Sequence, residues 1–151
     1  MLPESLHSEI TALLSEKTGG KTSIEKIIPL SGGSINNAFR LETDTGNYFM
    51  KYNRASAYPG MFEQEARGLE LLRGADEIRV PEVILPGDEG TYSFIILEHL
   101  DSSTKTDNFW EDFGRRLAAL HRHAGDKFGL DHDNYIGSLK QYNDRHERWT
   151  D

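Results

Sequence analysis

The sequence predicts an α+β fold, with an antiparallel sheet of about five strands and a helix packed on it. Short β-type runs separated by turn signals fill residues 22–53. Residues 62–72 carry an apolar stripe at helical spacing, and residues 94–97 form an uninterrupted apolar run. Hydrophobic residues make up 36% of the 151 residues, which is enough for one ordinary core.

Three segments are predicted as helices. Residues 4–17 form the first, which Gly19 and Gly20 end, and residues 62–73 form the second, which follows Pro59-Gly60 and ends at Gly74. Residues 108–124 form the third, which Asp107 caps and Gly125 ends. The apolar residues that carry these three patterns are Leu6, Ile10, Leu13, Leu14, Phe62, Ala66, Leu69, Leu72, Phe109, Phe113, Leu117 and Leu120.

Five runs are predicted as strands. Three of them are joined by turns and make a small antiparallel sheet, with a turn signal at Asp44-Thr45-Gly46. A fourth run contains Pro81 and suits only an edge, whereas the fifth reads as a buried central strand. The runs are residues 23–30, 36–42, 47–52, 80–85 and 92–98. Residues 126–151 show scattered apolar positions without a clear period.

Charge and composition exclude several functions. The net charge of −8 argues against nucleic-acid and anionic-membrane partners. No apolar run approaches the ~20 residues of a membrane span, and the first ten residues lack the pattern of a signal peptide. The chain has no cysteine, so it has no disulfide, thiolate metal site or cysteine nucleophile. We therefore expect a cytoplasmic location.

A glycine-containing turn lies between the first two predicted strands. Gly32 and Gly33 lack side chains, so the backbone there can approach a ligand and direct its N–H groups at phosphate oxygens. Ser34, Asn36 or Asn37 could add donors. Short glycine motifs are common in plain hairpin turns, and that reading stays open on this feature alone.

Lys51 follows in the third predicted strand, in the order that kinases use for the lysine that meets the α and β phosphates. Glu65, in the second helix beside Ala66, lies at the margin of the apolar stripe and is expected to reach Lys51. Glu63 is the rival partner. The alternatives are a solvated lysine on an edge strand and carboxylates that only complement a helix dipole.

A buried strand that exits into a polar loop offers an apolar slot and unpaired backbone groups, which an adenine base requires. The candidate backbone is that of Glu98, His99 and Leu100. The glycine turn, strand lysine, helix glutamate and apolar strand form a combination far more specific than any one part.

The chain resembles the fructosamine kinase family, the ketoamine kinases related to aminoglycoside and choline kinases, over almost its whole length. The similar stretches are GGSINNAFRL, Lys51, FEQEARGLELL, VPEVI, LEHL, GRRLAALHRH and FGLDHDNYIGSLKQYN. The resemblance implies a protein-kinase-like N-terminal lobe in residues 1–100, then a hinge-side loop and the start of an incomplete C-terminal lobe in residues 101–151. It also implies ATP and Mg²⁺ as cofactors and phosphorylation of a sugar hydroxyl on a small-molecule or protein-bound ketoamine.

The resemblance assigns nucleotide-binding roles to Gly32, Gly33, Ser34, Asn37, Lys51, Glu65, Glu98, His99 and Leu100. It places Asp133, Asn134 and Tyr135 on the substrate side. Some members of the family have a cysteine at the position of Ser34, so thiol-based redox control cannot operate here.

The catalytic residues of the family are expected outside this sequence. The His-Gly-Asp motif that bears the catalytic aspartate does not occur in it, and neither does the later acidic residue that holds magnesium. The chain therefore corresponds to the N-terminal half, and we expect it to be inactive alone. Alternatives are another small-molecule kinase, such as one for aminoglycosides or choline, and a non-enzymatic interaction module. We also expect uncovered apolar surface that promotes self-association.

The histidines do not predict a metal site. His121 and His123 are two residues apart on the expected helix and point about 200° away from each other, so they cannot share an ion. We expect His121 to pack partly beside Leu117 and Leu120, and His123 to face solvent.

Overall fold

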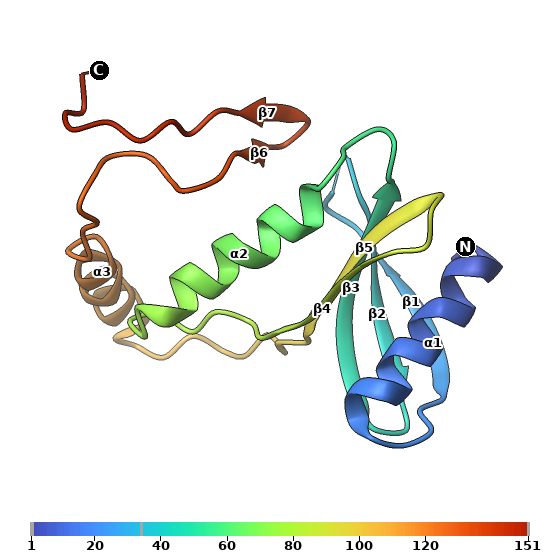
Figure 1. Cartoon of the computed structure of the whole chain (residues 1–151). Helices are drawn as coiled ribbons and strands as arrows, with labels where there is room; N and C mark the ends of the chain where they lie inside the picture. The colour runs from blue at the N-terminus through green and yellow to red at the C-terminus, as the bar shows by residue number, and fades with distance from the viewer. Residues whose placement is uncertain (1, 34, 151) are drawn as a thin grey trace.

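The computed structural model describes residues 2–33 and 35–150 (Figure 1). Ser34, one of the expected phosphate donors, lies outside the described residues. In chain order the elements are α1 (Glu4–Thr18), β1 (Ile24–Leu30), β2 (Asn37–Thr43), β3 (Gly46–Arg54), α2 (Met61–Gly74), β4 (Val83–Asp88), β5 (Tyr92–Glu98), α3 (Phe109–Leu120), β6 (Asn134–Ile136) and β7 (Leu139–Gln141).

The predicted five-stranded antiparallel sheet is confirmed, with the strand order β1-β2-β3-β5-β4. The central strand prediction for residues 92–98 is also confirmed, since β5 pairs with both β3 and β4 and its residues 93–97 are buried. β4 is an edge strand, as expected. It begins after Pro81 and runs through Pro86, because the edge of a sheet leaves room for a residue that has no N–H to donate.

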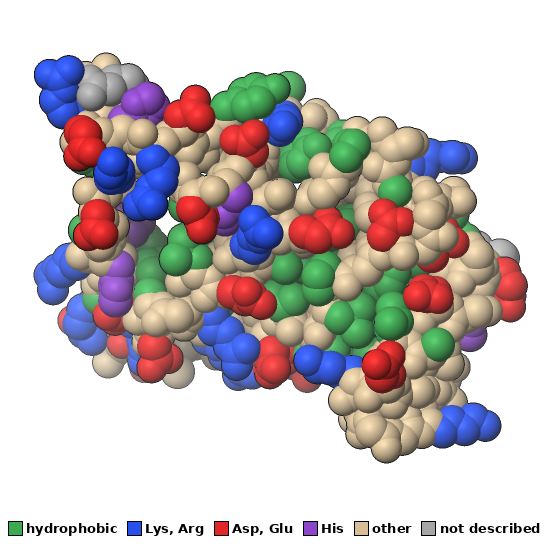
Figure 2. All heavy atoms as spheres, viewed as in Figure 1, with side chains coloured by type: hydrophobic (Ala, Val, Ile, Leu, Met, Phe, Trp, Pro, Cys, Tyr) green, Lys and Arg blue, Asp and Glu red, His purple; other side chains and the backbone are tan. Residues whose placement is uncertain are grey.

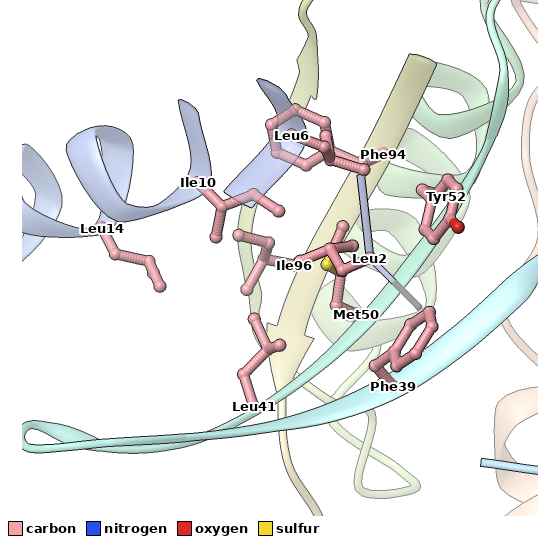
Figure 3. Close-up of a cluster of buried hydrophobic side chains, with 10 residues drawn as sticks. All are labelled: Leu2, Leu6, Ile10, Leu14, Phe39, Leu41, Met50, Tyr52, Phe94 and Ile96. Carbon is pink, nitrogen blue, oxygen red and sulfur yellow. The ribbon is translucent and has the colours of Figure 1, made fainter. Parts of the chain in front are cut away.

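Helix α1 covers one face of the sheet and completes the larger core. Its buried residues Leu6, Ile10 and Leu14 are spaced one turn apart and meet alternate residues of the strands (Figure 3). The strand residues of this core are Phe39, Leu41, Met50, Tyr52, Phe94 and Ile96, and Leu2 joins them from the N-terminal end.

Helix α2 packs on the opposite face and forms a second, smaller core. Phe62 and Ala66 are buried there against Ile95 and Leu97 of β5, with Val83 of β4 at its margin. These strand residues alternate with those that face α1, as the two-residue period of a strand requires. Each face of the sheet therefore carries one helix.

Two expectations about α3 are wrong. The helix is flanked by Asn108 in place of Asp107, without a side-chain cap, and it ends at Leu120, four residues before Ala124. No residue of α3 is buried, so packing does not hold a further turn. After Leu120 the backbone hydrogen bonds span three residues and not four. The Arg122 N–H donates to the Ala119 carbonyl at 3.0 Å, and the His123 N–H donates to the Leu120 carbonyl at 3.2 Å.

A β6–β7 hairpin lies in the tail, where the apolar residues follow no clear period. Its two-residue turn is Gly137-Ser138, and Gly137 adopts a φ of 60°, which favours glycine. The hairpin lies beside α2 in the fold (Figure 1). Tyr135 fixes it there, because its hydroxyl donates to the Pro59 carbonyl at 3.0 Å and its ring meets Tyr58 edge-on.

Apolar side chains remain on the surface around α3 and the tail. Those of Trp110, Phe113, Leu117, Ile136, Leu139 and Trp149 are exposed. Figure 2 shows apolar patches interspersed with charged side chains on one face of the molecule. The expected uncovered apolar surface is therefore present, and self-association through it stays a prediction. Within the described residues, no helix is both long and apolar enough to cross a membrane.

We predict that Leu6→Ala lowers the free energy of unfolding by about 2–4 kcal/mol, because it leaves a cavity in the core under α1. Leu71→Ala is the matched control, since Leu71 lies on α2 and is 60% exposed. It should change the free energy of unfolding by less than about 0.5 kcal/mol. Urea denaturation of both variants measures the difference. Equal losses would contradict the assignment of α1 to the core.

Candidate functional site

The face of the sheet that carries α2 is only half covered. Helix α2 packs over β4 and β5, reaches β3 at Phe49 and Lys51, and leaves the part over β1 and β2 open. The register places Leu30 and Ala38 on this open part, and Phe49 lies at its edge, where it also packs against the smaller core. They line a cavity of about 670 Å³, and Leu30 is 37% exposed although its side chain is apolar. An apolar wall of this kind suits a flat, aromatic ligand.

The glycine turn forms the rim of this cavity, which Gly32 and Gly33 both line. Gly32 has a φ of 120°, which residues with a side chain rarely adopt. A Cβ on Gly33 would lie 3.1 Å from the Asn36 carbonyl oxygen, so the turn has little room for one. The bare backbone of the turn can therefore approach a ligand in the cavity.

Lys51 stands at the boundary between the open and covered parts. Its neighbours across the sheet are Ala38 on one side and Ile95 on the other, and all three face α2. Its side chain is 23% exposed, and Nζ lies 2.6 Å from Oε1 and 2.8 Å from Oε2 of Glu65. The predicted pairing is confirmed, whereas the rival Glu63 is exposed.

Glu65 reaches Lys51 because of its position on α2. It directly precedes Ala66, which packs on Ile95, and it lies three residues after the buried Phe62. Its side chain is 28% exposed, so one edge of the ion pair is open to the cavity and to solvent. A half-buried lysine oriented by a carboxylate is a fixed cation that can neutralise an anionic ligand.

A second cavity, of about 610 Å³, lies on the other side of Lys51, between α2 and the β6–β7 hairpin. Asn134 and Tyr135 line it, together with Asn36, Lys51 and Glu65. Asp133, the third residue expected on the substrate side, does not line it. Its carboxylate accepts a hydrogen bond from the Asn143 N–H at 3.2 Å and lies 3.4 Å from Lys140 Nζ, so it stabilises the tail.

The expected adenine edge follows β5. The Glu98 N–H donates to the Glu82 carbonyl at 2.8 Å, and its carboxylate accepts a hydrogen bond from Arg79 at 2.6 Å. That bond is the main reason that the pKa of Glu98 is lowered. The backbone N–H of Glu98 is thus already used, and His99 and Leu100 continue in irregular backbone. None of the three lines the cavity of the glycine turn.

The other predicted residues are dispersed. Asn37 lines a separate hollow on the α1 side with Leu2 and Phe39, because it alternates with Ala38 along β2. His121 is exposed, so its expected packing is wrong, and His123 lies 3.2 Å from Glu77. Among the described residues, no three His, Cys, Asp or Glu side chains come together where they could hold a metal ion.

Sequence reasoning missed the apolar wall. The wall residues are Leu30, Ala38 and Phe49, and each lies one or two residues from Gly32, Asn37 or Lys51 in the sequence. Counting alternate strand residues back from Lys51 would have found Phe49. Asn36, which the sequence left as one of three donors, lines both cavities beside Lys51.

The family model described as fructosamine kinase matches residues 6–151 of this chain. A "Probable ketoamine kinase" of Synechocystis sp. is 36% identical over 94% of this chain and 48% of its own length. A chloroplastic protein-ribulosamine 3-kinase of Arabidopsis thaliana is 42% identical over 88% of this chain and 41% of its own length. The chain therefore spans about half the length of the curated relatives it matches.

Solved structures agree with this similarity. The crystal structure of a "Putative fructosamine-3-kinase" from Haemophilus somnus has a TM-score of 0.84 and 33% identity, and the match covers 93% of this chain and 48% of that one. Another from Thermobifida fusca has a TM-score of 0.74 and 29% identity over the same shares. The likeness confirms the expected fold, a protein-kinase-like lobe built on a five-stranded antiparallel sheet.

We predict that Arg79→Met raises the pKa of Glu98 toward its ordinary value, since the Arg79 hydrogen bond is the main cause that lowers it. The pair stabilises the fold at neutral pH, and this contribution is lost as the pH falls through the lowered pKa of the folded state. Carbon-13 NMR titration of the Glu98 carboxyl measures the shift. Arg115→Met, on α3, is the control and should leave the titration of Glu98 unchanged, and an unmoved midpoint in Arg79→Met would refute the assignment.

Proposed function

Because the chain belongs to the fructosamine kinase family, we propose that it supplies the nucleotide-binding part of an ATP-dependent ketoamine kinase. The observation that carries the proposal is the Lys51–Glu65 ion pair at the edge of an apolar cavity rimmed by the glycine turn. A fixed lysine, a bare backbone and an apolar wall are the features that bind phosphates and a base together.

Each part of the site has a proposed role. Leu30, Ala38 and Phe49 pack against the adenine. The backbone from Glu98 to Leu100, at the end of β5, binds its edge through groups other than the Glu98 N–H, which donates to the Glu82 carbonyl. The glycine turn (Gly32, Gly33 and Ser34) covers the phosphates, with Asn36 or Asn37 as a further donor. Lys51 binds the phosphates, and Glu65 orients it. Support comes from the shared cavity of Gly32, Gly33, Asn36 and Lys51.

ATP fits the residues present, because the cavity combines an apolar wall with a fixed cation and the bare backbone of the glycine turn. Bound ATP supplies the phosphoryl group. The described residues offer no cluster of carboxylates that could hold Mg²⁺, the second cofactor that the family implies. The residues of this chain bind the nucleotide, neutralise phosphate charge at Lys51 and orient that lysine through Glu65.

The proposed substrate is a small-molecule or protein-bound ketoamine, and phosphorylation of its sugar hydroxyl destabilises the adduct, which is a deglycation reaction. The names of the relatives, ketoamine kinase and protein-ribulosamine 3-kinase, support this class. We propose Asn134 and Tyr135 as substrate-side residues, since their cavity adjoins Lys51, and Asp133 as the residue that supports their hairpin. The proposed location is the cytoplasm, although one relative is named chloroplastic.

A specific observation favours an interaction surface as a second function. The aromatic side chains of Trp110 and Phe113 on α3 are exposed and adjacent, with ring centroids 6.4 Å apart. If the chain binds ATP and binding depends on Lys51 as described below, the kinase is favoured. If the chain binds no ATP, the interaction surface is the function that remains.

We predict that this chain binds ATP weakly and that Lys51→Ala weakens binding at least about tenfold, because it removes a charge-assisted contact to phosphate. Glu65→Gln should weaken it less, since Lys51 keeps its charge and loses only its orientation. Titration calorimetry with ATP and magnesium measures both. The matched control is Lys26→Ala, which should leave the affinity unchanged. Lys26 is an exposed lysine of β1 that pairs with Glu42 of β2.

We predict no measurable ketoamine phosphorylation by this chain alone. Phosphoryl transfer requires a group that orients the attacking hydroxyl and ligands that fix the metal, and the described residues hold no such cluster. A coupled assay with a fructosamine substrate tests this. Turnover that disappears in Lys51→Ala would show that the catalytic centre lies within this chain.

A further inference from the structure

The side chain of Asn53, near the end of β3, is buried and fully engaged. The residue is 3% exposed, and its Nδ2 donates to Asn36 Oδ1 at 2.9 Å. Its Oδ1 accepts a hydrogen bond from the Ser93 hydroxyl at 2.9 Å, and Nδ2 also lies 3.3 Å from the Met61 sulfur. One amide thus contacts three segments that are far apart in the sequence.

Two of these segments carry the proposed nucleotide site. Asn36 follows the glycine turn and lines both cavities beside Lys51. Met61, which is 5% exposed, is the first residue of α2, four residues before Glu65. Ser93 is the third partner and belongs to the rigid part of the fold, because it is 2% exposed in β5 and pairs with Asn53 across the sheet.

The flanks of both segments have other attachments, because Leu30 pairs with Ala38 beside the turn and Phe62 is buried in the smaller core. Asn53 adds a polar contact at the turn and at the first residue of α2. Gly32 and Gly33 have no side chains, so Asn36 is the nearest described side chain that ties the turn to the sheet by a hydrogen bond. The residue before α2 is Gly60, which provides no side-chain cap. A buried amide holds both at fixed distances because its hydrogen bonds are directional, and leaving it unpaired is costly.

We propose that Asn53 is a positioning residue that fixes the glycine turn and the start of α2 relative to each other. In this way it sets the distance between the N–H groups of the turn and the Lys51–Glu65 pair. Its effect on nucleotide affinity rests on the proposed function, whereas its effect on the two segments does not.

Hydrogen exchange of the whole chain tests the structural part without a nucleotide. In Asn53→Ala, exchange should rise at least about fivefold both in residues 31–36 and in residues 60–66, and stay unchanged in residues 39–50 of the sheet. Asn36→Ala cuts the same hydrogen bond without a cavity in the core and should loosen residues 31–36, which keeps the test decisive if Asn53→Ala fails to fold.

ATP affinity tests the consequence. Asn53→Ala and Asn36→Ala should each raise the ATP dissociation constant about threefold to tenfold. The double variant should bind ATP no more than about twofold more weakly than Asn53→Ala, because Asn53→Ala already removes the hydrogen bond that Asn36→Ala cuts. Thr22→Val is the control, since Thr22 is 1% exposed and its hydroxyl bonds Thr18 on the α1 side. It should lower the melting temperature and leave affinity unchanged.

Two results would overturn the proposal and leave Asn53 as a core residue only. One is a uniform rise of hydrogen exchange across the whole sheet in Asn53→Ala, and the other is a change in ATP affinity no larger than that of Thr22→Val. If the unmodified chain binds no ATP, the proposed function fails, and the exchange pattern of the two segments still decides the positioning role.

Discussion

The alternation of side chains along β3 is the constraint on which both cores and the site depend. Met50 and Tyr52 face α1 and join the larger core, so Phe49 and Lys51 must face α2. A shift of the register by one residue would place Lys51 in the apolar core and Met50 at the open cavity. The free energy of burying the residues under α1 therefore fixes where the ammonium lies.

Helices α1 and α2 cover the two faces of the sheet to different extents. Helix α1 completes a core on one face, whereas α2 covers the β4 and β5 side of the other, reaches β3 only at its edge and leaves the apolar residues over β1 and β2 open. The Lys51–Glu65 pair lies where covered and open parts meet. An ion pair whose side chains are 23% and 28% exposed contributes on the order of 1 kcal/mol to stability, so its value lies in holding a charge at a fixed place.

The segment from α3 onward is held by other interactions than the sheet and its two helices. Its residues bury little apolar surface, and hydrogen bonds and a few aromatic contacts place it, such as Tyr135 with Pro59 and Phe128 with Trp149. Lys105 lies over the rings of Phe109 and Trp110, which partly shields an aromatic group that no core covers. The sheet and its two helices therefore hold most of the buried apolar residues and set the position of the site.

The sequence by itself determined the element types of residues 4–98 and the pairing of Lys51 with Glu65, because strand and helix periods are local and Glu65 lies on the margin of a clear apolar stripe. Only the tertiary structure decided which half of the sheet stays open, where α3 ends and how Asn53 joins Asn36 to Ser93. The β6–β7 hairpin had a local turn signal but needed α2 as a partner. The open part of the sheet, the end of α3 and the contacts of Asn53 depend on residues far apart in the sequence, so no local pattern records them.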